Sequence, residues 1–503
     1  MATAVKDQLW RLIHSLSKAE KRSFKLYATR AGSTVDSKFI QLFDVLDRLP
    51  EPNDDQAMAR MKITSGQYSN LKRHLYQQLL TSLRLIYIDK EIDIELREQL
   101  DFARILYGKG HYLDALRILE RAKAKAVEHN QDLLHLEILE FQKLIEARHI
   151  TLSRQDEDKL EYLVNESAER SFSVLNTSEL FNINIQIHGR YIENGHSRGP
   201  EDELVNREFW KSIQRGHIDR DSVAHTFHQK INRFQAAMWY NYIQLQLDDA
   251  LESARNAIAL FEISRHMVMK DPDLYLRALY YVTLFAYLNR DEKMVARYLR
   301  RMEDFLSNEN ILLNENSQLI GHTYQYLSQF NHHFLRRDGA AAYALSLEVT
   351  AAYTEGRFLP NEQRWGLFRY KCAAACFLTH RFGEALDHLN EIINLRSGIL
   401  REDLLINSRI LHAICHFEIG NLALVDYHLT GLSRLLRKSR EAAEVHRLAI
   451  STLRRLLKCP PNEHLPIYQQ LARDLDQPTR HPFEQKALVY LNLQDWLNLH
   501  TPA

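Results

Sequence analysis

The sequence contains few of the residues that break secondary structure. It has 16 glycines and 11 prolines among 503 residues, less than half of the roughly 7% and 5% that are usual in globular proteins. Hydrophobic residues make up 45% of the chain and charged residues 26%. A chain with so few breakers runs through long regular segments, and helices suit such segments best. The scarcity disfavours sheet sandwiches, collagen-like chains and disordered chains, and it predicts an all-α protein.

Two further absences concern the compartment. The chain has only four cysteines, Cys372, Cys376, Cys415 and Cys459, which is too few for a disulfide scaffold of this length. No stretch approaches the 18 uncharged apolar residues of a membrane span, and no apolar signal core follows the N-terminus. We therefore expect a soluble cytoplasmic protein without contact to a membrane.

The signatures of catalysis are also missing. The sequence has no P-loop, no His-Glu-x-x-His zinc helix, no nucleophile elbow and no calcium loop. Gly108-Lys109-Gly110 comes closest to a glycine loop, but it lies in a predicted turn between helices without a preceding strand. Carboxylates are spread over predicted helix faces, as solvated surfaces require. The sequence therefore predicts a non-enzymatic protein without catalytic residues or a cofactor.

Residues 1–90 form a predicted compact helical module. An apolar stripe over 5–16 predicts a first helix, and Ser17-Lys18-Ala19-Glu20 has the pattern of a capping box that opens a second helix, Lys18 to about Arg30. A third helix is predicted over 38–49 and a short fourth after Asp54-Asp55. A fifth, long helix then runs through Ile88.

From residue 91 the pattern changes to pairs of helices of similar length. Ala115, Leu119 and Ala122 follow the small residue Ala103 and the turn residue Gly110. The same order recurs later with a constant offset, because Ala373 and Ala413 are 40 residues apart and so are Ala385 and Val425. Small residues at fixed points let antiparallel helices approach closely, so these positions predict repeating helix pairs.

This spacing of small and aliphatic residues resembles the tetratricopeptide repeat. The resemblance implies a right-handed α-solenoid over residues 91–480, with a possible bend near 193–222, where breakers gather, and a C-terminal capping helix over 481–503. The repeat here departs from the family in its period, which is near 40 instead of about 34 residues, and in lacking the closing proline.

The two ends of the chain resemble a group of uncharacterised bacterial helical-repeat proteins. The shared segments are Ser15-Leu16-Ser17-Lys18-Ala19-Glu20-Lys21-Arg22-Ser23-Phe24-Lys25-Leu26 and Tyr490-Leu491-Asn492-Leu493-Gln494-Asp495-Trp496-Leu497. This resemblance supports the fold and implies no activity.

Stacked helix pairs build a concave groove that binds peptides or protein surfaces. The first hypothesis is therefore an interaction scaffold with a protein or peptide partner. Repeat geometry places six groove residues on the first helices of three pairs: Arg104, Tyr107, Arg369, Thr379, Asn407 and Glu418.

One set of residues has the composition of a metal site. Cys372 and Cys376 are four apart on one predicted helix, and His412 and His416 are four apart on the equivalent helix of the next pair. Two cysteines and two histidines form a zinc ligand set if the helices bring them together. The alternative is that the cysteines pack inside the repeat as small hydrophobic residues.

The net charge is zero, with 65 basic and 65 acidic residues, but residues 1–86 carry +6. Lys18, Lys21, Arg22 and Lys25 form one helical stripe there, and Arg447, Arg454, Arg455 and Lys458 form a second stripe. A basic helix face suits phosphate contacts, or it is simply solvated. The alternative function is a peptide-sensing regulator whose N-terminal module contacts nucleic acid.

Overall fold

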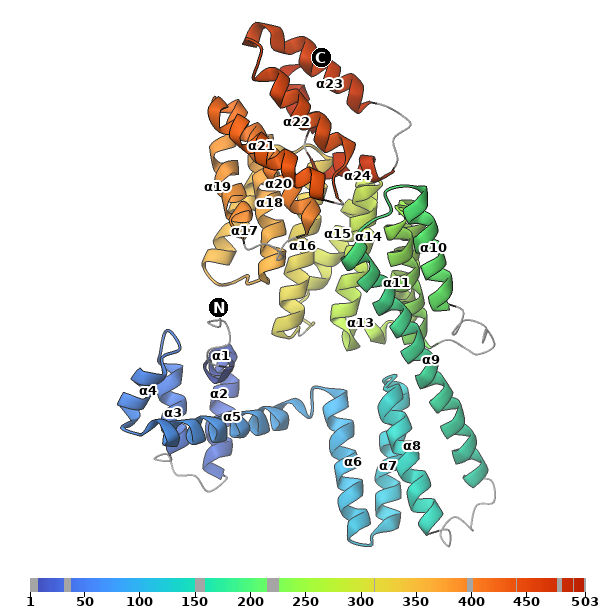
Figure 1. Ribbon diagram of the computed structural model, residues 1–503. Coiled ribbons are helices and arrows are strands. Elements are labelled where there is room, and N and C mark those ends of the chain that lie inside the picture. Colours follow the sequence, from blue (N-terminus) through green and yellow to red (C-terminus); the bar gives the residue numbers. More distant parts are fainter. Residues whose placement is uncertain are drawn as a thin grey trace. The chain divides into compact units, whose positions relative to one another are not determined.

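The computed structural model describes residues 8–30, 38–149, 159–214, 226–311, 313–395, 401–439, 441–476, 482–491 and 493–501. Throughout these ranges the regular secondary structure is helical and no strand is present (Figure 1). This confirms the all-α prediction. None of the described helices has the length and apolar character needed to cross a membrane.

The chain divides into two compact units, residues 1–174 and 175–503. The long helix α9 (Lys159–Asn194) contains the division. The sequence predicted a domain boundary at residue 90 and a possible bend near 193–222. The division between the two units, at residues 174 and 175, falls between these two predicted positions.

Unit 1 contains eight described helices before α9. They are α1 (Gln8–Ser15), α2 (Lys18–Arg30), α3 (Lys38–Asp47), α4 (Asp54–Met61), α5 (Ser65–Tyr87), α6 (Ile92–Gly108), α7 (Tyr112–Glu128) and α8 (Asp132–Arg148). The first five share a hydrophobic cluster around Phe24, Phe43 and Leu79. A separate cluster around Ala103 and Ala115 joins α6, α7 and α8. The first 90 residues therefore have a core of their own.

Helix α2 begins as the sequence predicted. The backbone N–H of Ser17 donates to Oε2 of Glu20 at 2.8 Å, and the N–H of Glu20 donates to Oγ of Ser17 at 3.2 Å. These reciprocal bonds satisfy amides that have no partner inside the helix. The predicted capping box is confirmed.

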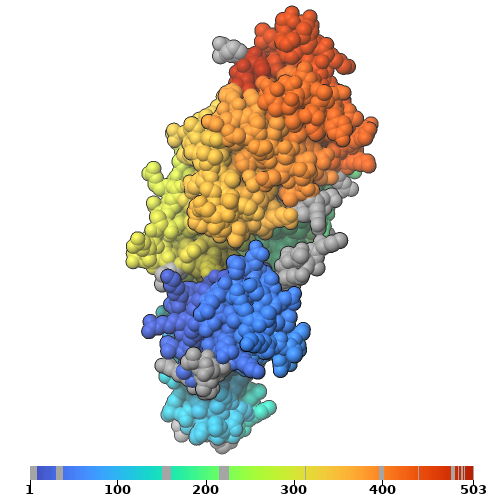
Figure 2. All heavy atoms as spheres, turned by 90° about the vertical axis from the view of Figure 1, so that its left-hand side faces the viewer, coloured from blue at the N-terminus to red at the C-terminus, as the bar shows by residue number. Residues whose placement is uncertain are grey.

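Unit 2 contains the second half of α9 and sixteen further described α-helices. They are α10 (Pro200–Gln214), α11 (Phe227–Ile243), α12 (Leu247–Ile263), α13 (His266–Lys270), α14 (Pro272–Leu288), α15 (Glu292–Leu306), α16 (Glu315–Leu335), α17 (Gly339–Thr354), α18 (Glu362–Leu378), α19 (Phe382–Ile393), α20 (Glu402–Glu418), α21 (Leu422–Lys438), α22 (Glu444–Leu456), α23 (His464–Leu475), α24 (Pro482–Tyr490) and α25 (Leu493–His500). A short 3₁₀ turn, η2 (Pro461–Glu463), precedes α23. From α14 to α22, each helix packs against the next one along the chain. In Figure 2 the side chains of α17 to α21 (yellow-orange to orange) form one continuous surface.

The predicted offset of 40 residues is visible in the helix bounds. Helices α18 and α20 have equal length and begin 40 residues apart, at Glu362 and Glu402. The small residues that carried the prediction, Ala373 and Ala413, are both fully buried. These two small residues therefore mark equivalent positions at which the helices pack closely.

The turns inside these helix pairs share one backbone feature. The residue two positions before the second helix has a left-handed conformation, with φ of +84° at Gly110 and +82° at Gly420. The same place is held by non-glycine residues in other pairs: Leu245, Arg290, Arg337 and His380. Glycine adopts this conformation without steric cost, whereas other residues do not.

The C-terminal segment, predicted as a capping helix over 481–503, contains two described helices. Helix α24 ends at Tyr490 and α25 begins at Leu493. Trp496 and Leu497 of α25 are fully buried. The indole N–H of Trp496 donates to Oε1 of Glu418 at 2.6 Å, which fastens α25 to the end of α20. The apolar side of α25 is therefore packed into the core of unit 2.

Candidate functional site

Unit 2 contains a cavity of ≈ 380 Å³ between six helices, which we call the aromatic cavity. Helices α11, α14, α16, α18 and α20 and the end of α9 supply its lining. Most of its large side chains are tyrosines, together with one tryptophan: Tyr191, Trp239, Tyr242, Tyr280, Tyr281, Tyr287, Tyr324 and Tyr370. A concave site with apolar walls and a few polar groups is the usual form of a binding site.

Six of these eight aromatic side chains form a connected network of ring contacts along the cavity wall. The rings of Tyr280 and Tyr324 stack with centroids 4.3 Å apart. Trp239 contacts Tyr191 at 5.3 Å and Tyr281 at 5.7 Å between ring centroids. Because each ring is held by its neighbours, the wall presents rigid apolar surface at little cost in side-chain entropy.

Four cations line the same cavity: Arg277, Arg364, Lys371 and Arg401. In the described part of the chain, neither Arg277 nor Arg364 has an ion-pair partner. The guanidinium of Arg364 lies 5.9 Å from the ring centroid of Tyr324. Arg277 is exposed on the groove side of α14. Both guanidinium groups are therefore available to an anionic group.

Lys371 is the only one of these cations that is fully enclosed by the protein. It is 7% exposed, and its Nζ donates to Oδ1 of Asn331 at 2.7 Å. The rings of Tyr287 and Phe334 lie 5.6 Å and 5.2 Å from Nζ. Burial lowers the pKa of Lys371 to about 7, because the ammonium loses its hydration. The amine therefore changes charge near neutral pH.

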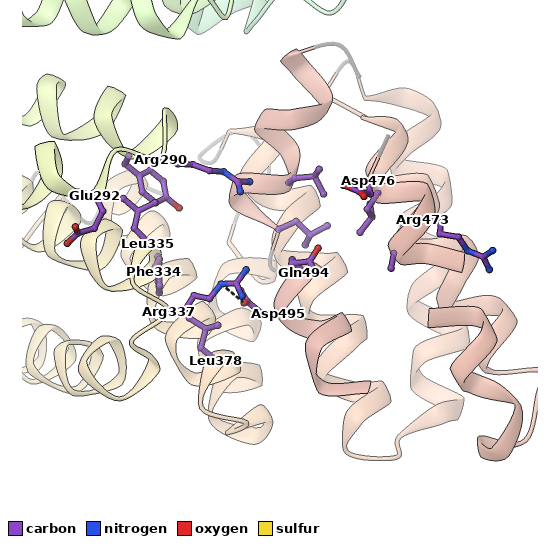
Figure 3. Close-up of a pocket in the computed structure, with 15 residues that line it drawn as sticks. Arg290, Glu292, Phe334, Leu335, Arg337, Leu378, Arg473, Asp476, Gln494 and Asp495 are labelled. Atoms are coloured by element: carbon purple, nitrogen blue, oxygen red, sulfur yellow. Dashed lines mark ion pairs between the residues drawn. The ribbon is translucent and has the colours of Figure 1, made fainter. Parts of the chain in front are cut away.

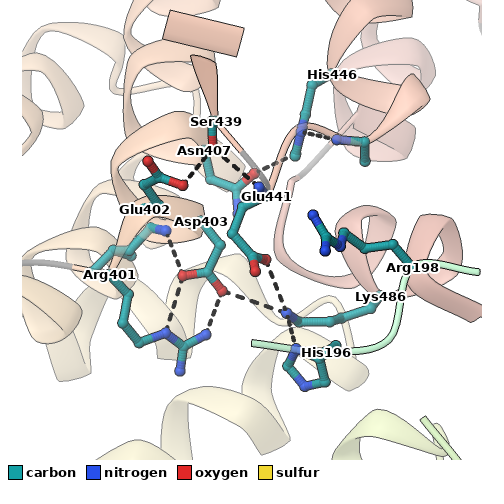
Figure 4. Close-up of polar contacts among 12 residues, drawn as sticks. His196, Arg198, Arg401, Glu402, Asp403, Asn407, Ser439, Glu441, His446 and Lys486 are labelled. Carbon is teal, nitrogen blue, oxygen red and sulfur yellow. Dashed lines mark hydrogen bonds and ion pairs between the residues drawn. The ribbon is translucent and has the colours of Figure 1, made fainter. Parts of the chain in front are cut away.

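Arg401 belongs to a buried charge network at the edge of the cavity (Figure 4). Its Nε donates to Oδ1 of Asp403 at 3.0 Å, and its Nη2 binds the other oxygen of the same carboxylate. Nζ of Lys486 lies 3.5 Å from Oδ2 of Asp403 and 4.0 Å from Oε2 of Glu441. The two cations hold the pKa of the Asp403 carboxyl well below its usual range, although burial alone would raise it. Burial raises the pKa of Glu441.

The same network receives the loop between α9 and α10. Nδ1 of His196 lies 2.8 Å from Nζ of Lys486, and both side chains are buried. Gly195, with φ of +69°, comes so close to this network that an added Cβ would lie 2.3 Å from Oε1 of Glu441. The breaker-rich stretch that the sequence marked as a bend therefore contains a loop seated in the core of unit 2.

Two larger hollows of unit 2 have other properties. One, of ≈ 690 Å³, lies between the turns of α14–α17 and the C-terminal helices (Figure 3). Its charges are mixed, and Arg337 lies 4.0 Å from Asp495 across it. The second, of ≈ 610 Å³, lies between α21 and α22 and is lined by cations only among its charged residues: Arg437, Arg447, Arg454, Arg455 and Lys458.

The six predicted groove residues are placed differently from one another. Asn407 lines the aromatic cavity, where its Oδ1 accepts from Nε2 of His446 at 3.0 Å. Arg369 contacts Glu391 and His388 on α19, at 2.7 Å and 2.8 Å.

The other predicted residues make structural contacts. The hydroxyl of Thr379 donates to the carbonyl of Ala375 at the end of its own helix, and Glu418 accepts from Trp496 and from His500. Arg104 pairs with Glu137 at 2.8 Å, and Tyr107 accepts from Arg148 at 3.1 Å, both within unit 1.

The sequence prediction missed most of the cavity lining. The signal was present as aromatic and basic residues three or four positions apart on the first helices of the pairs, such as Trp239 with Tyr242 and Arg277 with Tyr281. Such spacing puts side chains on one helix face. The spacing alone does not show whether that face packs against a neighbouring helix or lines an open groove, because this depends on the tertiary packing.

The structure separates the residues of the predicted zinc set. Cys372 and Cys376 are 0% and 1% exposed and lie in the hydrophobic core of α18. His412 and His416 instead meet His428 of α21, and one ring nitrogen of each lies within 4.8 Å of the others. The Cys2His2 set is not assembled. His428 lies on the second helix of its pair, whereas the predicted zinc ligands all lie on first helices.

The two predicted basic stripes also differ. On α2, Lys21 pairs with Asp47 at 2.6 Å and Lys25 pairs with Asp44 at 2.7 Å, whereas Lys18 and Arg22 are exposed. In the second stripe, three cations of α22 and Lys458, which follows that helix, all line the ≈ 610 Å³ hollow. The first stripe is half neutralised by α3, and the second is gathered around one cleft.

Comparisons with known proteins add no assignment. No protein-family model matches the chain, and no curated protein or solved structure is significantly similar to it.

Proposed function

We propose that this protein is a non-enzymatic interaction scaffold that binds an extended acidic peptide in the aromatic cavity of unit 2. The observation that carries the proposal is the pair Arg277 and Arg364, two guanidinium groups without an ion-pair partner in the described part of unit 2, set in a wall of tyrosines. Arginine binds carboxylates with two parallel hydrogen bonds, and tyrosine supplies rigid contact area.

The arrangement of helices supports this kind of ligand. Five helices that begin successive pairs line one cavity, and the first helices of tetratricopeptide-like pairs form the concave side of a solenoid. We propose that α11–α22 stack as a right-handed, tetratricopeptide-like α-solenoid. The free cysteines, three of them buried, suit a protein of the reducing cytoplasm.

Selection of peptides by the purified protein tests the proposal. A phage-displayed library of random linear peptides is panned on the immobilised full-length chain, and enriched peptides are measured by fluorescence anisotropy. We expect enrichment of aspartate and glutamate. The double variant R277A/R364A should bind the enriched peptides at least tenfold more weakly, because each lost charged hydrogen bond is worth roughly 1.5–3 kcal/mol.

The matched control is R255A/R300A, which removes two exposed arginines of the second helices α12 and α15. This variant should bind the selected peptides as tightly as the wild type. Peptides without an acidic preference, or equal losses in both double variants, would contradict a groove built around Arg277 and Arg364.

The nucleic-acid alternative draws less support from the geometry. Two of the four cations in the α2 stripe are paired with aspartates of α3, so this stripe offers half of its charges to phosphates.

A further inference from the structure

Three histidines meet near the turn of the α20–α21 helix pair. His412 and His416 are one turn apart on α20, and His428 faces them from α21 across the turn at Gly420. The ring centroid of His412 lies 4.5 Å from that of His416 and 4.8 Å from that of His428. His412 is buried, whereas His416 and His428 are half-buried. The group therefore reaches from the core to the solvent.

The spacing of the ring nitrogens is close to that of a metal site. They lie within 4.8 Å of one another, and nitrogens bound to a tetrahedral zinc ion at about 2.0–2.1 Å are roughly 3.4 Å apart. Small rotations of the imidazole rings close this gap. A metal entering from the solvent side meets His416 and His428 first, because these two are partly exposed.

The surroundings keep the three rings neutral and hold two of them in place. Burial and the two neighbouring rings lower the pKa of His412 to about 3, and burial also lowers the pKa values of His416 and His428. Nε2 of His412 lies 3.0 Å from Oδ1 of Asn390, and Nδ2 of Asn421 donates to Nδ1 of His416 at 3.2 Å. The first contact is of the kind that orients metal-binding imidazoles, because the ring donates its N–H to an amide oxygen.

We propose that His412, His416 and His428 form a binding site for a divalent transition-metal ion, with zinc as the representative ion. Neutral imidazoles suit zinc, copper and nickel, whereas oxygen ligands suit magnesium and calcium. Three protein ligands leave a fourth position for water or an anion. Arg409 lies close enough to act electrostatically on His412 and His428, and its positive charge favours an anionic fourth ligand.

The preceding helix pair offers an internal comparison. Cys372, Cys376 and His388 occupy the positions 40 residues before His412, His416 and His428. There, Nδ1 of His388 lies 2.8 Å from Nη1 of Arg369, and the three side chains do not form a metal-binding group. The site is therefore a property of the α20–α21 pair and does not follow from the repeat itself.

Zinc titration of the untagged full-length chain, stripped of metal with a chelator, tests the proposal. In competition with a chromogenic zinc indicator, we expect one site that is absent from H416Q/H428Q. Each single variant, H416Q or H428Q, should weaken zinc binding by at least tenfold. The matched control H388Q, at the equivalent place in the preceding pair, should bind zinc like the wild type. Zinc binding that is equal in the wild type and in H416Q/H428Q overturns the proposal.

A second measurement needs no variant and decides the question if the substitutions disturb folding. Diethylpyrocarbonate modifies accessible imidazoles, and mass spectrometry locates each adduct. Saturating zinc should protect His416 and His428 but not the exposed His380. Equal modification of His416 and His428 with and without zinc would overturn the metal site.

Discussion

Lys486 and His196 are 290 residues apart in the sequence, yet Nζ of Lys486 lies 2.8 Å from Nδ1 of His196. The contact joins the loop before α10 to helix α24, so the first and last parts of unit 2 meet beside the aromatic cavity. Asp403 and Glu441 supply the negative charge that makes this burial of Lys486 tolerable. The wall that carries Arg401 and Asn407 therefore depends on the two ends of the unit.

Substitution of Asp403 tests this dependence. In D403N, the ammonium of Lys486 and the guanidinium of Arg401 lose their shared carboxylate. Removal of one partner from a buried ion pair typically costs 3–5 kcal/mol, and we expect a loss of this order in urea unfolding. The control D114N breaks an exposed pair with Arg117 and should cost less than about 1 kcal/mol. Equal losses in the two variants would show that the network does not support the fold.

The pKa of Lys371 predicts a pH-dependent stability. Its folded-state pKa is lowered from 10.5 to about 7. Between these values the unfolded chain binds more protons than the folded chain, so this residue makes stability rise with pH. K371M lacks the effect. The stability advantage of K371M over the wild type should therefore shrink by about 2–3 kcal/mol between pH 6 and pH 9.

Paired denaturant titrations at pH 6, 7, 8 and 9 measure this difference. At each pH, the wild-type free energy of unfolding is subtracted from that of K371M. This removes the contribution of every other titrating group that the substitution leaves unchanged. A constant difference across the range would mean that Lys371 keeps its ordinary pKa in the folded chain.

The parts of this protein that were predictable from sequence are those set by local chemistry. The capping box at Ser17 and Glu20 and the 40-residue offset between Ala373 and Ala413 follow from hydrogen bonding and side-chain size, which act within a few residues. The aromatic cavity and the three-histidine group depend on which helix faces meet. Thr379 and Glu418 lie at the ends of first helices as predicted, but contacts within the chain use their polar groups.

The repeated turn before each second helix predicts opposite effects of two substitutions. Gly420 has φ of +82° with open space around it, and His380 has φ of +59° at the equivalent turn. A side chain in this region costs about 1–2 kcal/mol, partly offset by the greater entropy of unfolded glycine. We expect G420A to lose, and H380G to gain, roughly 0.5–1 kcal/mol.

Thermal unfolding of both variants measures these changes. Gly383, inside α19 and without a left-handed backbone or a close neighbour, is the control. G383A should be neutral or stabilising, because alanine favours helices more than glycine does. Destabilisation of H380G would show that the histidine ring contributes more at this turn than its backbone strain costs.

The ion pairs of α2 predict how steeply the affinity of the N-terminal module for DNA would fall with salt concentration. Each phosphate contact contributes about 0.9 to the slope of log affinity against log salt concentration. Within the α2 stripe, only Lys18 and Arg22 have no aspartate partner among the described residues, since Lys21 and Lys25 are bound to α3. Fluorescence anisotropy with a duplex oligonucleotide should therefore give the same slope for K18A/R22A as for the variant with all four residues changed to alanine. In both, the slope should fall by at most about 2 relative to wild type. A fall near 4 that requires all four substitutions would mean that DNA displaces Asp44 and Asp47 from the lysines, and it would favour the regulator over the scaffold.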